Sequence, residues 1–558
     1  MRQPTISLCM IVKNEEEHLP RCLKSVKGAV DEIIVVDTGS TDGTVEVARQ
    51  WGAHVIRSSW QNDFAYARNV GIEQAKGDWI LWLDADEELE AADRKKLREY
   101  AKHQEYEAFL LQIHNYVGDG SQGATINPVL RMFRNRPTYR FEGRIHEQIA
   151  ASIYRHKPEA AFHIAEIKIH HYGYQQEIVT KKDKIRRNLN LLRQMAAEQP
   201  EDPFTQYNLG VEYLRSSDVK QALDAFRMAK SLLDPAATSY AHLLFKYEIW
   251  CLLALGRVEE ANRICDEGID LYPQYTDLHH LKGVCLTQLG KPEEAKNSFL
   301  HAIELGPAPS GYHTEEGMGT YQTCYALGML YEAVREYNNA VEWYLQAVHF
   351  KSSLNPPLYR IFHLMRCTGA QSRIVSFIDE RFHLRTENAV AKIIDILFET
   401  DCLEPIPALA EQLQKGNFKE FKLMVQIKSL LLAGNLKGVR NAMGQLRFKD
   451  KAKFKKWLAW AEHGSDPAED DSLSTEELSL AVKIAFKNGR FDDTLRMISK
   501  WLQRLDEPES GKRIIRTLSS LADSHLGVLG QSPRFGDLVR DARLAAPCED
   551  GFSGGTLQ

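Results

Sequence analysis

Three carboxylates follow two short apolar runs in the first hundred residues. The runs are Ile33 to Val36 and Trp79 to Leu83, and the acids are Asp37, Asp84 and Asp86. Continuous apolar runs of this length suit strands that are buried on both faces of a parallel sheet. In such sheets ligands bind beyond the carboxyl ends of the strands, where these acids lie. Carboxylates separated by one residue can hold Mg²⁺ or Mn²⁺ and leave coordination positions open for diphosphate oxygens.

The elements that would position these acids alternate between strand and helix. Strands are expected over residues 6–12, 33–37, 54–57 and 79–83. Asn14 is expected to cap the first intervening helix, and Thr41 or Asp42 the second. The third helix carries its apolar residues on one face, namely Phe64, Ala67, Ile72 and Ala75. This alternation predicts an α/β domain with a parallel sheet and helices on both faces.

Four sequence runs carry a resemblance to a known family. They are SLCMIVKNEE (7–16), VVDTGSTDGT (35–44), WQNDFAYARNVGIEQAKGDWILWLDADEEL (60–89) and GRIHEQI (143–149). Together and in this order they resemble bacterial family 2 glycosyltransferases, which have the A-type nucleotide-sugar-binding fold. The subgroup is the one fused to tetratricopeptide repeats, which includes cytoplasmic enzymes that glycosylate peptides and proteins. For the enzyme part, the resemblance covers about the first 175 residues of the chain.

The resemblance implies a site for a UDP-sugar and a divalent cation. Asp37 matches the acid that contacts the uracil or ribose, and Asp84 with Asp86 matches the acidic motif that meets ribose and metal, Mn²⁺ or Mg²⁺. The family often reads VDDGS, and here Thr38 replaces the second acid and leaves one base-contacting carboxylate. Arg68 resembles the arginine that the family places near the donor, where a guanidinium suits diphosphate oxygens.

Asp63 resembles a recurrent donor-site acid of the same subgroup. It also directly precedes the third predicted helix. An aspartate in that position commonly accepts hydrogen bonds from the free amides of the first turn. Donor binding and helix capping are therefore equally supported for Asp63.

An inverting transferase needs a base that takes the acceptor proton. In the segment FEGRIHEQI (141–149) the candidates are Glu142 and Glu147, and Glu147 is favoured because it matches a recurring His–Glu pair of the subgroup. The run IKIHHYGY (167–174) resembles the region in which the family supplies a histidine to the metal or phosphate. His171 is the first choice there and His170 the second; histidine is compatible with Mn²⁺.

Charge, cysteine content and hydropathy give no support for a nucleic-acid partner, a disulfide framework or a membrane span. The net charge of −6 gives no electrostatic argument for nucleic acid as a partner. The nine cysteines form no CxxC pair, which favours a reduced, cytoplasmic setting. The apolar run Ile6 to Val12 is too short to span a bilayer, and it lacks the basic leader and cleavage site of a signal peptide. No membrane span is therefore expected.

The rest of the chain reads as an all-α, tetratricopeptide-like solenoid. We expect a catalytic domain over 1–175, a linker helix over 176–200, repeats over 201–355, degenerate helical repeats over 356–545 and a disordered tail over 546–558. Alanines 222, 261, 295 and 340 mark four copies, and the longer last spacing indicates an insertion at about 308–319. Such solenoids commonly hold an extended peptide on their concave side, and a homodimer through the repeats is equally compatible.

These observations favour a metal-dependent, inverting transferase that moves a hexose or N-acetylhexosamine from a UDP-sugar to a Ser, Thr or Cys side chain of a peptide or protein. Two alternatives remain open. One is sugar transfer to a glycan or lipid precursor in envelope biosynthesis, which the expected lack of a membrane span makes less favourable. The other is a non-catalytic repeat scaffold with a decayed transferase domain, although the retained acids, Arg68 and His171 argue against decay.

Overall fold

The structure is a computed structural model that describes residues 3–116, 124–172, 178–235, 238–382, 384, 386–413, 418–444, 451–463, 474–487 and 490–502. These residues form two compact units, one up to Leu330 and the other from Tyr331 onward. The predicted tail over 546–558 lies outside the described residues, as does the last part of the segment 356–545. The first unit contains the acids singled out above.

A nine-stranded sheet forms the centre of the N-terminal domain in the described part of the chain. Its path runs β3-β2-β1-β4-β7-β6-β8-β5, and β9 pairs with β7. The strands are β1 (Ile6–Val12), β2 (Glu32–Asp37), β3 (His54–Arg57), β4 (Trp79–Trp82), β5 (Glu87–Leu89), β6 (Ala108–Tyr116), β7 (Ala124–Arg134), β8 (Phe162–His171) and β9 (Thr314–Glu315).

The prediction of a parallel sheet is correct for β1 to β4, but the rest of the sheet is mixed, because β6 and β8 pair in parallel whereas β5 and β8 pair antiparallel. Strands β1, β2, β3 and β4 pair in parallel, as the alternation of strands and helices requires. Strand β7 then joins β4 antiparallel, and it pairs antiparallel with β6 along nearly its whole length. Because β6 and β7 follow each other without a crossover helix, they can only pair in this direction. The domain is therefore a mixed α/β domain.

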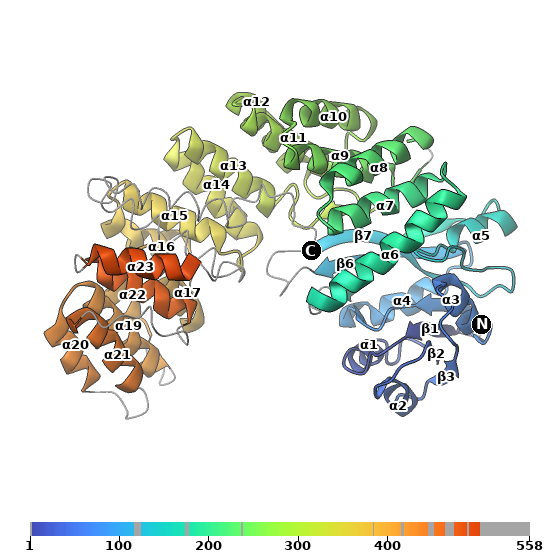
Figure 1. Ribbon diagram of the computed structural model, residues 1–558, viewed down its shortest axis with the longest axis horizontal. Helices are drawn as coiled ribbons and strands as arrows, with labels where there is room; N and C mark the ends of the chain where they lie inside the picture. Colours follow the sequence, from blue (N-terminus) through green and yellow to red (C-terminus); the bar gives the residue numbers. More distant parts are fainter. Residues whose placement is uncertain are drawn as a thin grey trace. The chain divides into compact units, whose positions relative to one another are not determined.

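Helices cover both faces of the sheet, as Figure 1 shows for the blue part of the chain. They are α1 (Leu19–Ser25), α2 (Thr44–Gln50), α3 (Phe64–Ile72), α4 (Arg94–Tyr100) and α5 (Ala150–His156). Side chains of β1 alternate between two apolar clusters, with Leu8 and Met10 in one and Cys9 in the other. This alternation is the expected result when a strand is buried on both faces.

The loops after β1 and β2 are tied to each other. The prediction that Asn14 caps a helix is wrong, because α1 begins only at Leu19. Asn14 instead has a φ of 57°, and its Oδ1 accepts a hydrogen bond from the Thr41 amide at 2.8 Å. Asp42 accepts a bond from the amide of Thr44, the first residue of α2, at 3.1 Å. These bonds fix the loops at the carboxyl edge of the parallel strands.

The segment after the sheet is helical, in agreement with the sequence. A long helix, α6 (Ile178–Glu198), leads into helix pairs that follow it in green in Figure 1. The pairs are α7 (Pro203–Arg215) with α8 (Val219–Leu232), α9 (Ala241–Ala254) with α10 (Val258–Leu271), and α11 (Thr276–Gln288) with α12 (Pro292–Leu305). A Cβ on Gly210 would lie 2.4 Å from the Phe226 ring, and a Cβ on Gly283 would lie 2.6 Å from the Phe299 ring. Glycine is thus required where the paired helices touch.

The insertion expected at about 308–319 has a structural role. It contains β9, which pairs with the start of β7 through Thr125 with Glu315 and Ile126 with Thr314. Lys246 of α9 donates to Glu315 at 2.7 Å and to Asp277 of α11 at 3.2 Å. The repeats are therefore joined to the catalytic sheet by strand pairing and by a buried ionic cluster.

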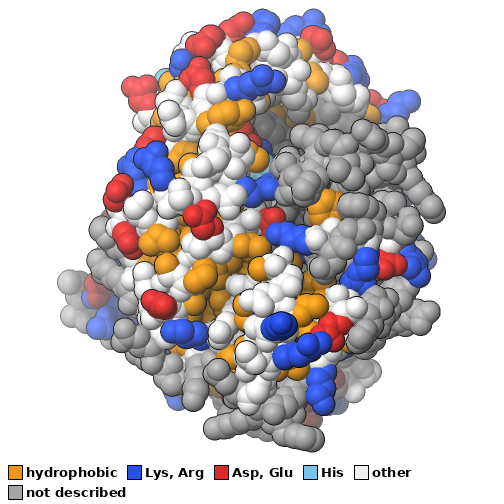
Figure 2. Space-filling view, turned by 90° about the vertical axis from the view of Figure 1, so that its left-hand side faces the viewer, with side chains coloured by type: hydrophobic (Ala, Val, Ile, Leu, Met, Phe, Trp, Pro, Cys, Tyr) orange, Lys and Arg blue, Asp and Glu red, His pale blue; other side chains and the backbone are white. Residues whose placement is uncertain are grey.

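The second unit is helical throughout its described residues, and α13 (Tyr321–Ala333) crosses the boundary into it. Its helices are α14 (Tyr337–Phe350), α15 (Pro356–Cys367), α16 (Ile374–Arg381), α17 (Glu387–Glu399), α18 (Ile406–Glu411), α19 (Lys419–Leu432), α20 (Leu436–Met443), α21 (Lys451–His463), α22 (Thr475–Lys487) and α23 (Phe491–Leu502). Figure 2 shows basic and acidic side chains interspersed on the face it displays, rather than gathered by sign.

Candidate functional site

A cleft of ≈ 860 Å³ lies at the carboxyl ends of β1 and β4. Five of the residues expected in the site line it: Arg68, Asp84, Asp86, Glu147 and His171. Four segments far apart in the sequence supply them, namely α3, the turn after β4, the loop 142–148 and the end of β8. The sheet therefore brings together residues that the sequence spreads over about a hundred positions.

Asp84 lies between two buried guanidinium groups. Arg68 Nη2 donates to its Oδ1 at 2.9 Å, and Arg131 Nη2 of β7 lies 3.7 Å from its Oδ2. Both guanidinium groups stack on the Trp82 ring, at 4.1 and 3.6 Å from its centroid. Burial opposes ionisation of Asp84, but Arg68 and Arg131 outweigh it and lower its pKa to about 2. Asp84 is thus a fixed negative charge.

Glu87 stabilises the turn that carries Asp84 and Asp86. Its Oε2 accepts a bond from the Asp84 amide at 3.0 Å, and its Oε1 pairs with Arg131. Burial raises the pKa of Glu87, and the nearby Asp84 adds to this effect, whereas Arg131 opposes it. The turn after β4 is therefore held by its own side chains before any ligand binds.

Asp86 and His171 lie close together in the cleft. His171 Nε2 lies 3.4 Å from Asp86 Oδ2, and Nδ1 lies 2.6 Å from Asn115 Oδ1. An amide oxygen only accepts, so it fixes the hydrogen on Nδ1. Burial alone would lower the pKa of His171, but Asp86, Glu87 and Asp84 outweigh it and raise the pKa. The electrostatic potential at His171 therefore favours a positive charge.

The two residues suit a divalent cation. Among the described residues no group of three His, Cys, Asp or Glu side chains is arranged as a complete metal site. One carboxylate and one imidazole form the partial donor set expected when substrate phosphates and water supply the remaining ligands. The carboxylates that raise the pKa of His171 would also attract a cation. The residues present therefore fit Mn²⁺ or Mg²⁺.

His170, the second choice, points to the other side of β8. Its Nε2 lies 3.1 Å from Glu90, and its Nδ1 lies 2.9 Å from the Tyr116 hydroxyl. Consecutive residues of a strand alternate between the two faces of a sheet, so only one of the histidines can face Asp86. The structure places His171 in that position.

Glu147 is held in the cleft by Arg68. Its Oε1 accepts a hydrogen bond from Arg68 Nε, and its side chain is 9% exposed. The preceding residue, His146, has a φ of 53°, which turns the chain so that Glu147 enters the cleft. Glu142 instead pairs with Arg155 and does not line the cleft. Of the two candidate bases, only Glu147 is close to the acidic turn.

Asp37 and Asp63, the remaining predicted site residues, do not line the cleft. Asp37 ends β2 and is buried, and its Oδ1 accepts a bond from the Ser40 amide at 3.0 Å. Asp63 caps α3 by accepting from the Tyr66 amide at 2.8 Å. Thr38, which lines the cleft, donates its hydroxyl to Val12 O at 3.1 Å. The helix-capping interpretation of Asp63 is therefore confirmed, and its donor-binding role stays a prediction.

Sequence reasoning missed Arg131, Asn115 and Trp82. Arg131 lies on β7 and Asn115 lies on β6, and no strand was predicted for that region. Trp82 was assigned only to an apolar run, although its ring supports two guanidinium groups. A signal was present in VLRMF (129–133), where one arginine interrupts an otherwise apolar stretch. A charged residue in such a position is normally paired.

Fold and site together define an enzyme that transfers a sugar from a nucleotide-sugar. Residues 7–158 match the family described as glycosyl transferase family 2, and residues 276–309 and 321–351 match the tetratricopeptide repeat. The prediction of a glycosyltransferase domain fused to such repeats is confirmed.

Curated relatives support the same assignment. The chain is 37% identical over 272 residues to a TPR repeat-containing protein of Synechococcus elongatus, which covers 48% of this chain and 64% of that protein. It is 30% identical over 292 residues to the SPbeta prophage-derived glycosyltransferase SunS of Bacillus subtilis, which covers 51% and 67%. The chain belongs to glycosyltransferase family 2.

Solved structures that match parts of this chain do so with low TM-scores. The structure of S. aureus TarS 1-349 in complex with UDP-GlcNAc covers 51% of this chain at 13% identity, with a TM-score of 0.29. The structure of MamA covers 31% at 15% identity, with a TM-score of 0.26. Separately, none of the described helices is both long and apolar enough to cross a bilayer.

Proposed function

We propose that the chain is a metal-dependent, inverting transferase that moves a hexose or N-acetylhexosamine from a UDP-sugar to a Ser, Thr or Cys side chain of a peptide or protein. The observation that carries this proposal is the position of two pairs in one cleft, Asp86 with His171 and Arg68 with Glu147. The first pair suits the donor diphosphate with its cation, and the second suits proton removal from an acceptor.

In this proposal Asp86 and His171 hold the cation, Mn²⁺ or Mg²⁺. When bound, the cation would supply positive charge to the departing diphosphate. Asn115 keeps Nδ1 of His171 protonated, so that the lone pair of Nε2 would be available to a cation held between His171 and Asp86. Asp84 is held ionised and immobile by Arg68 and Arg131, which suits a hydrogen bond to the donor ribose. Asp37 at the end of β2 is assigned to the uracil side of the donor.

Glu147 is the proposed base. Its Oε1 is occupied by Arg68, whereas its Oε2 accepts no hydrogen bond from any described residue. Oε2 is therefore the atom that would take the proton of a Ser or Thr hydroxyl as that oxygen attacks the anomeric carbon. Arg68 makes bonds to both Asp84 and Glu147, so it sets the separation between the donor side and the acceptor side. Nη1, which makes neither of these two bonds, is the nitrogen of Arg68 that could donate to the diphosphate.

A peptide or protein acceptor is supported by the attachment of the repeats. Tetratricopeptide repeats commonly bind extended peptides on their concave surface. Here β9 and the Lys246 cluster join the repeats directly to the sheet that carries the cleft. The described cysteines are all free thiols, which suits a reducing cytoplasm in which nucleotide-sugars are available.

The test measures binding and slow hydrolysis of a panel of UDP-sugars, with and without Mn²⁺, by wild type and Asp86→Asn. We expect one UDP-sugar to bind in a Mn²⁺-dependent manner and to be hydrolysed, and both properties to be lost in Asp86→Asn. Glu88→Gln is the matched control, because Glu88 lies two residues away and pairs with Arg21 at 3.8 Å instead. Failure of every donor to bind would contradict the proposal and favour a scaffold.

A further inference from the structure

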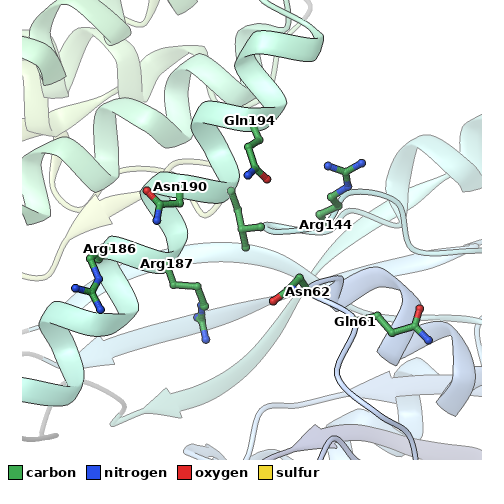
Figure 3. A pocket seen from close by; sticks show the side chains of 8 residues that line it. Gln61, Asn62, Arg144, Arg186, Arg187, Asn190 and Gln194 are labelled. Atoms are coloured by element: carbon green, nitrogen blue, oxygen red, sulfur yellow. The ribbon is translucent and has the colours of Figure 1, made fainter.

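A second cavity of ≈ 650 Å³ lies beside the catalytic cleft in the same unit, and we call it the α6 pocket. Figure 3 shows α6 on one side of it and the loop at Gln61 and Asn62 with Arg144 on the other. The lining residues are Gln61, Asn62, Arg144, Arg186, Arg187, Asn190, Leu191 and Gln194. The mechanism described above uses none of these residues.

The lining of the α6 pocket is cationic and rich in side-chain amides. It holds three guanidinium groups, four amides and one leucine, and none of the described lining residues is an acid. Arg187 donates to Asn188 Oδ1 at 3.1 Å, and no described carboxylate lies within ion-pairing distance of it. Arg144 pairs with Glu198 at 3.2 Å, but both side chains are about half exposed, so an incoming carboxylate can compete for it. The pocket thus suits an anionic ligand.

The α6 pocket adjoins the catalytic cleft. Arg187 lines both cavities, and its guanidinium lies 5.6 Å from the Phe64 ring of the cleft wall. Trp60 of the cleft donates from Nε1 to Asn62 Oδ1 at 3.0 Å, and the Phe64 amide donates to Arg144 O at 2.9 Å. The two segments that line the pocket therefore continue into the segments that carry Arg68 and Glu147.

We propose that the α6 pocket is an acceptor subsite that binds acidic residues flanking the modified side chain of a peptide. A ligand there would reach the cleft on the side of Glu147, because Arg144 lies in the same short loop. Guanidinium groups pair with carboxylates in a bidentate manner, and the four amides can both donate to and accept from a peptide backbone. A polyphosphate acceptor would use the arginines but would offer few donors to the amide oxygens, so a peptide is favoured. This inference rests on the proposed function.

Peptide binding tests the subsite without catalysis. The probes are fluorescein-labelled peptides with a central Ser or Cys and flanks that are acidic, neutral or basic. We expect the full-length protein to bind the acidic peptide best, and Arg186→Gln and Arg144→Gln to weaken that binding by about fivefold to tenfold each. Arg193→Gln is the matched control, because Arg193 lies on α6 but contacts Tyr213 outside the pocket. The control should bind like wild type.

Steady-state kinetics separate this inference from the proposed function. With the same peptides, the Arg186→Gln and Arg144→Gln variants should raise KM for the acidic acceptor, with kcat and UDP-sugar hydrolysis unchanged. Transfer to peptides with no preference for acidic flanks, or equal KM values in all variants, would overturn the subsite and leave the proposed function standing. Donor hydrolysis together with transfer only to a glycan or lipid precursor would overturn both the subsite and the peptide acceptor.

Discussion

Arg68 and Glu147 form an ion pair inside the cleft, although 79 positions separate them in the chain. Their side chains are only 7% and 9% exposed, so each charge depends on the other for compensation. The same guanidinium bonds Asp84 through Nη2. The geometry between the donor acid and the proposed base is therefore fixed by one arginine.

Glu147→Gln should separate hydroxyl acceptors from thiol acceptors. Serine must lose its proton during attack, so removal of the base should lower kcat on a serine peptide by about 10² to 10⁴. A cysteine thiol has a pKa of about 8.5 and is partly ionised near neutral pH, so the loss on a cysteine peptide should be far smaller. The measurement is kcat on two peptides that differ only at the acceptor residue.

Glu142→Gln is the control for this comparison, because Glu142 lies in the same loop and pairs with Arg155 away from the cleft. It should leave both rates close to wild type. Wild-type turnover of Glu147→Gln on the serine peptide would exclude Glu147 as the base.

The position of the acidic residues Asp84 and Asp86 could be predicted from the sequence, whereas the position of Arg131 could not. Asp84 and Asp86 follow an apolar run directly, so their place at a strand end can be deduced from local pattern. Arg131 comes from a strand that pairs antiparallel with β4, and that pairing joins residues more than fifty positions apart. Local periodicity does not specify such a pairing, so the second guanidinium beside Asp84 could not be placed.

The same limit applies to the insertion before the last clear repeat. Its length was visible as a gap in the alanine spacing, but its role depends on pairing with β7, about 190 positions earlier. Thr314 and Glu315 form too short a strand to give a periodic signal. By contrast, the helix pairs of the repeats are built from local contacts, and glycines 210 and 283 each face an aromatic side chain of their own helix pair.

Asn115→Leu should weaken metal activation without removing a metal ligand. Asn115 Oδ1 fixes the tautomer and orientation of His171, and loss of such a partner typically lowers metal affinity by about 10- to 100-fold. The measurement is the Mn²⁺ concentration at half-maximal UDP-sugar hydrolysis after treatment with a chelator. Asn127→Leu is the control, because Asn127 bonds the Asn115 amide nitrogen and lies one step farther from His171. An equal Mn²⁺ requirement in wild type and Asn115→Leu would contradict the orientation role.

Glu107 should contribute stability that disappears in acid. It is buried and accepts bonds from Arg136 at 2.6 Å, Lys157 at 2.7 Å and the Tyr139 hydroxyl at 2.9 Å. Burial opposes its ionisation, but these bonds outweigh burial and lower the pKa of Glu107 to about 2 from an ordinary 4.5. A lowered folded-state pKa gives stability that is complete above the unfolded value and is lost as the pH falls from about 5 toward 2.

Glu107→Gln should therefore lower the free energy of unfolding by about 2 kcal/mol at pH 7, a value reduced for the solvent exposure of its partners, and by progressively less below pH 5. The measurement is urea denaturation at several pH values, followed by tryptophan fluorescence. Glu99→Gln is the control, because Glu99 is exposed and pairs with Lys102 at the surface, so its loss should change stability little at any of these pH values. A difference that stays constant from pH 7 to pH 3 would refute the assignment to ionised Glu107.

Lys246→Met should loosen the junction between the repeats and the sheet. The Lys246 side chain is 1% exposed, and its removal leaves the buried Asp277 without its cation, which costs about 3–5 kcal/mol for a buried pair. Because the lost contacts lie at one junction, hydrogen exchange of peptides from β7 and β9 reports on them more directly than global unfolding does. Both should exchange faster in Lys246→Met.

The double variant with Asp277→Asn should recover part of the protection, since the uncompensated charge is then gone. Lys282→Met removes an exposed partner of Asp266 and should leave the exchange unchanged. Unchanged protection of β9 in Lys246→Met would show that strand pairing alone joins the two parts.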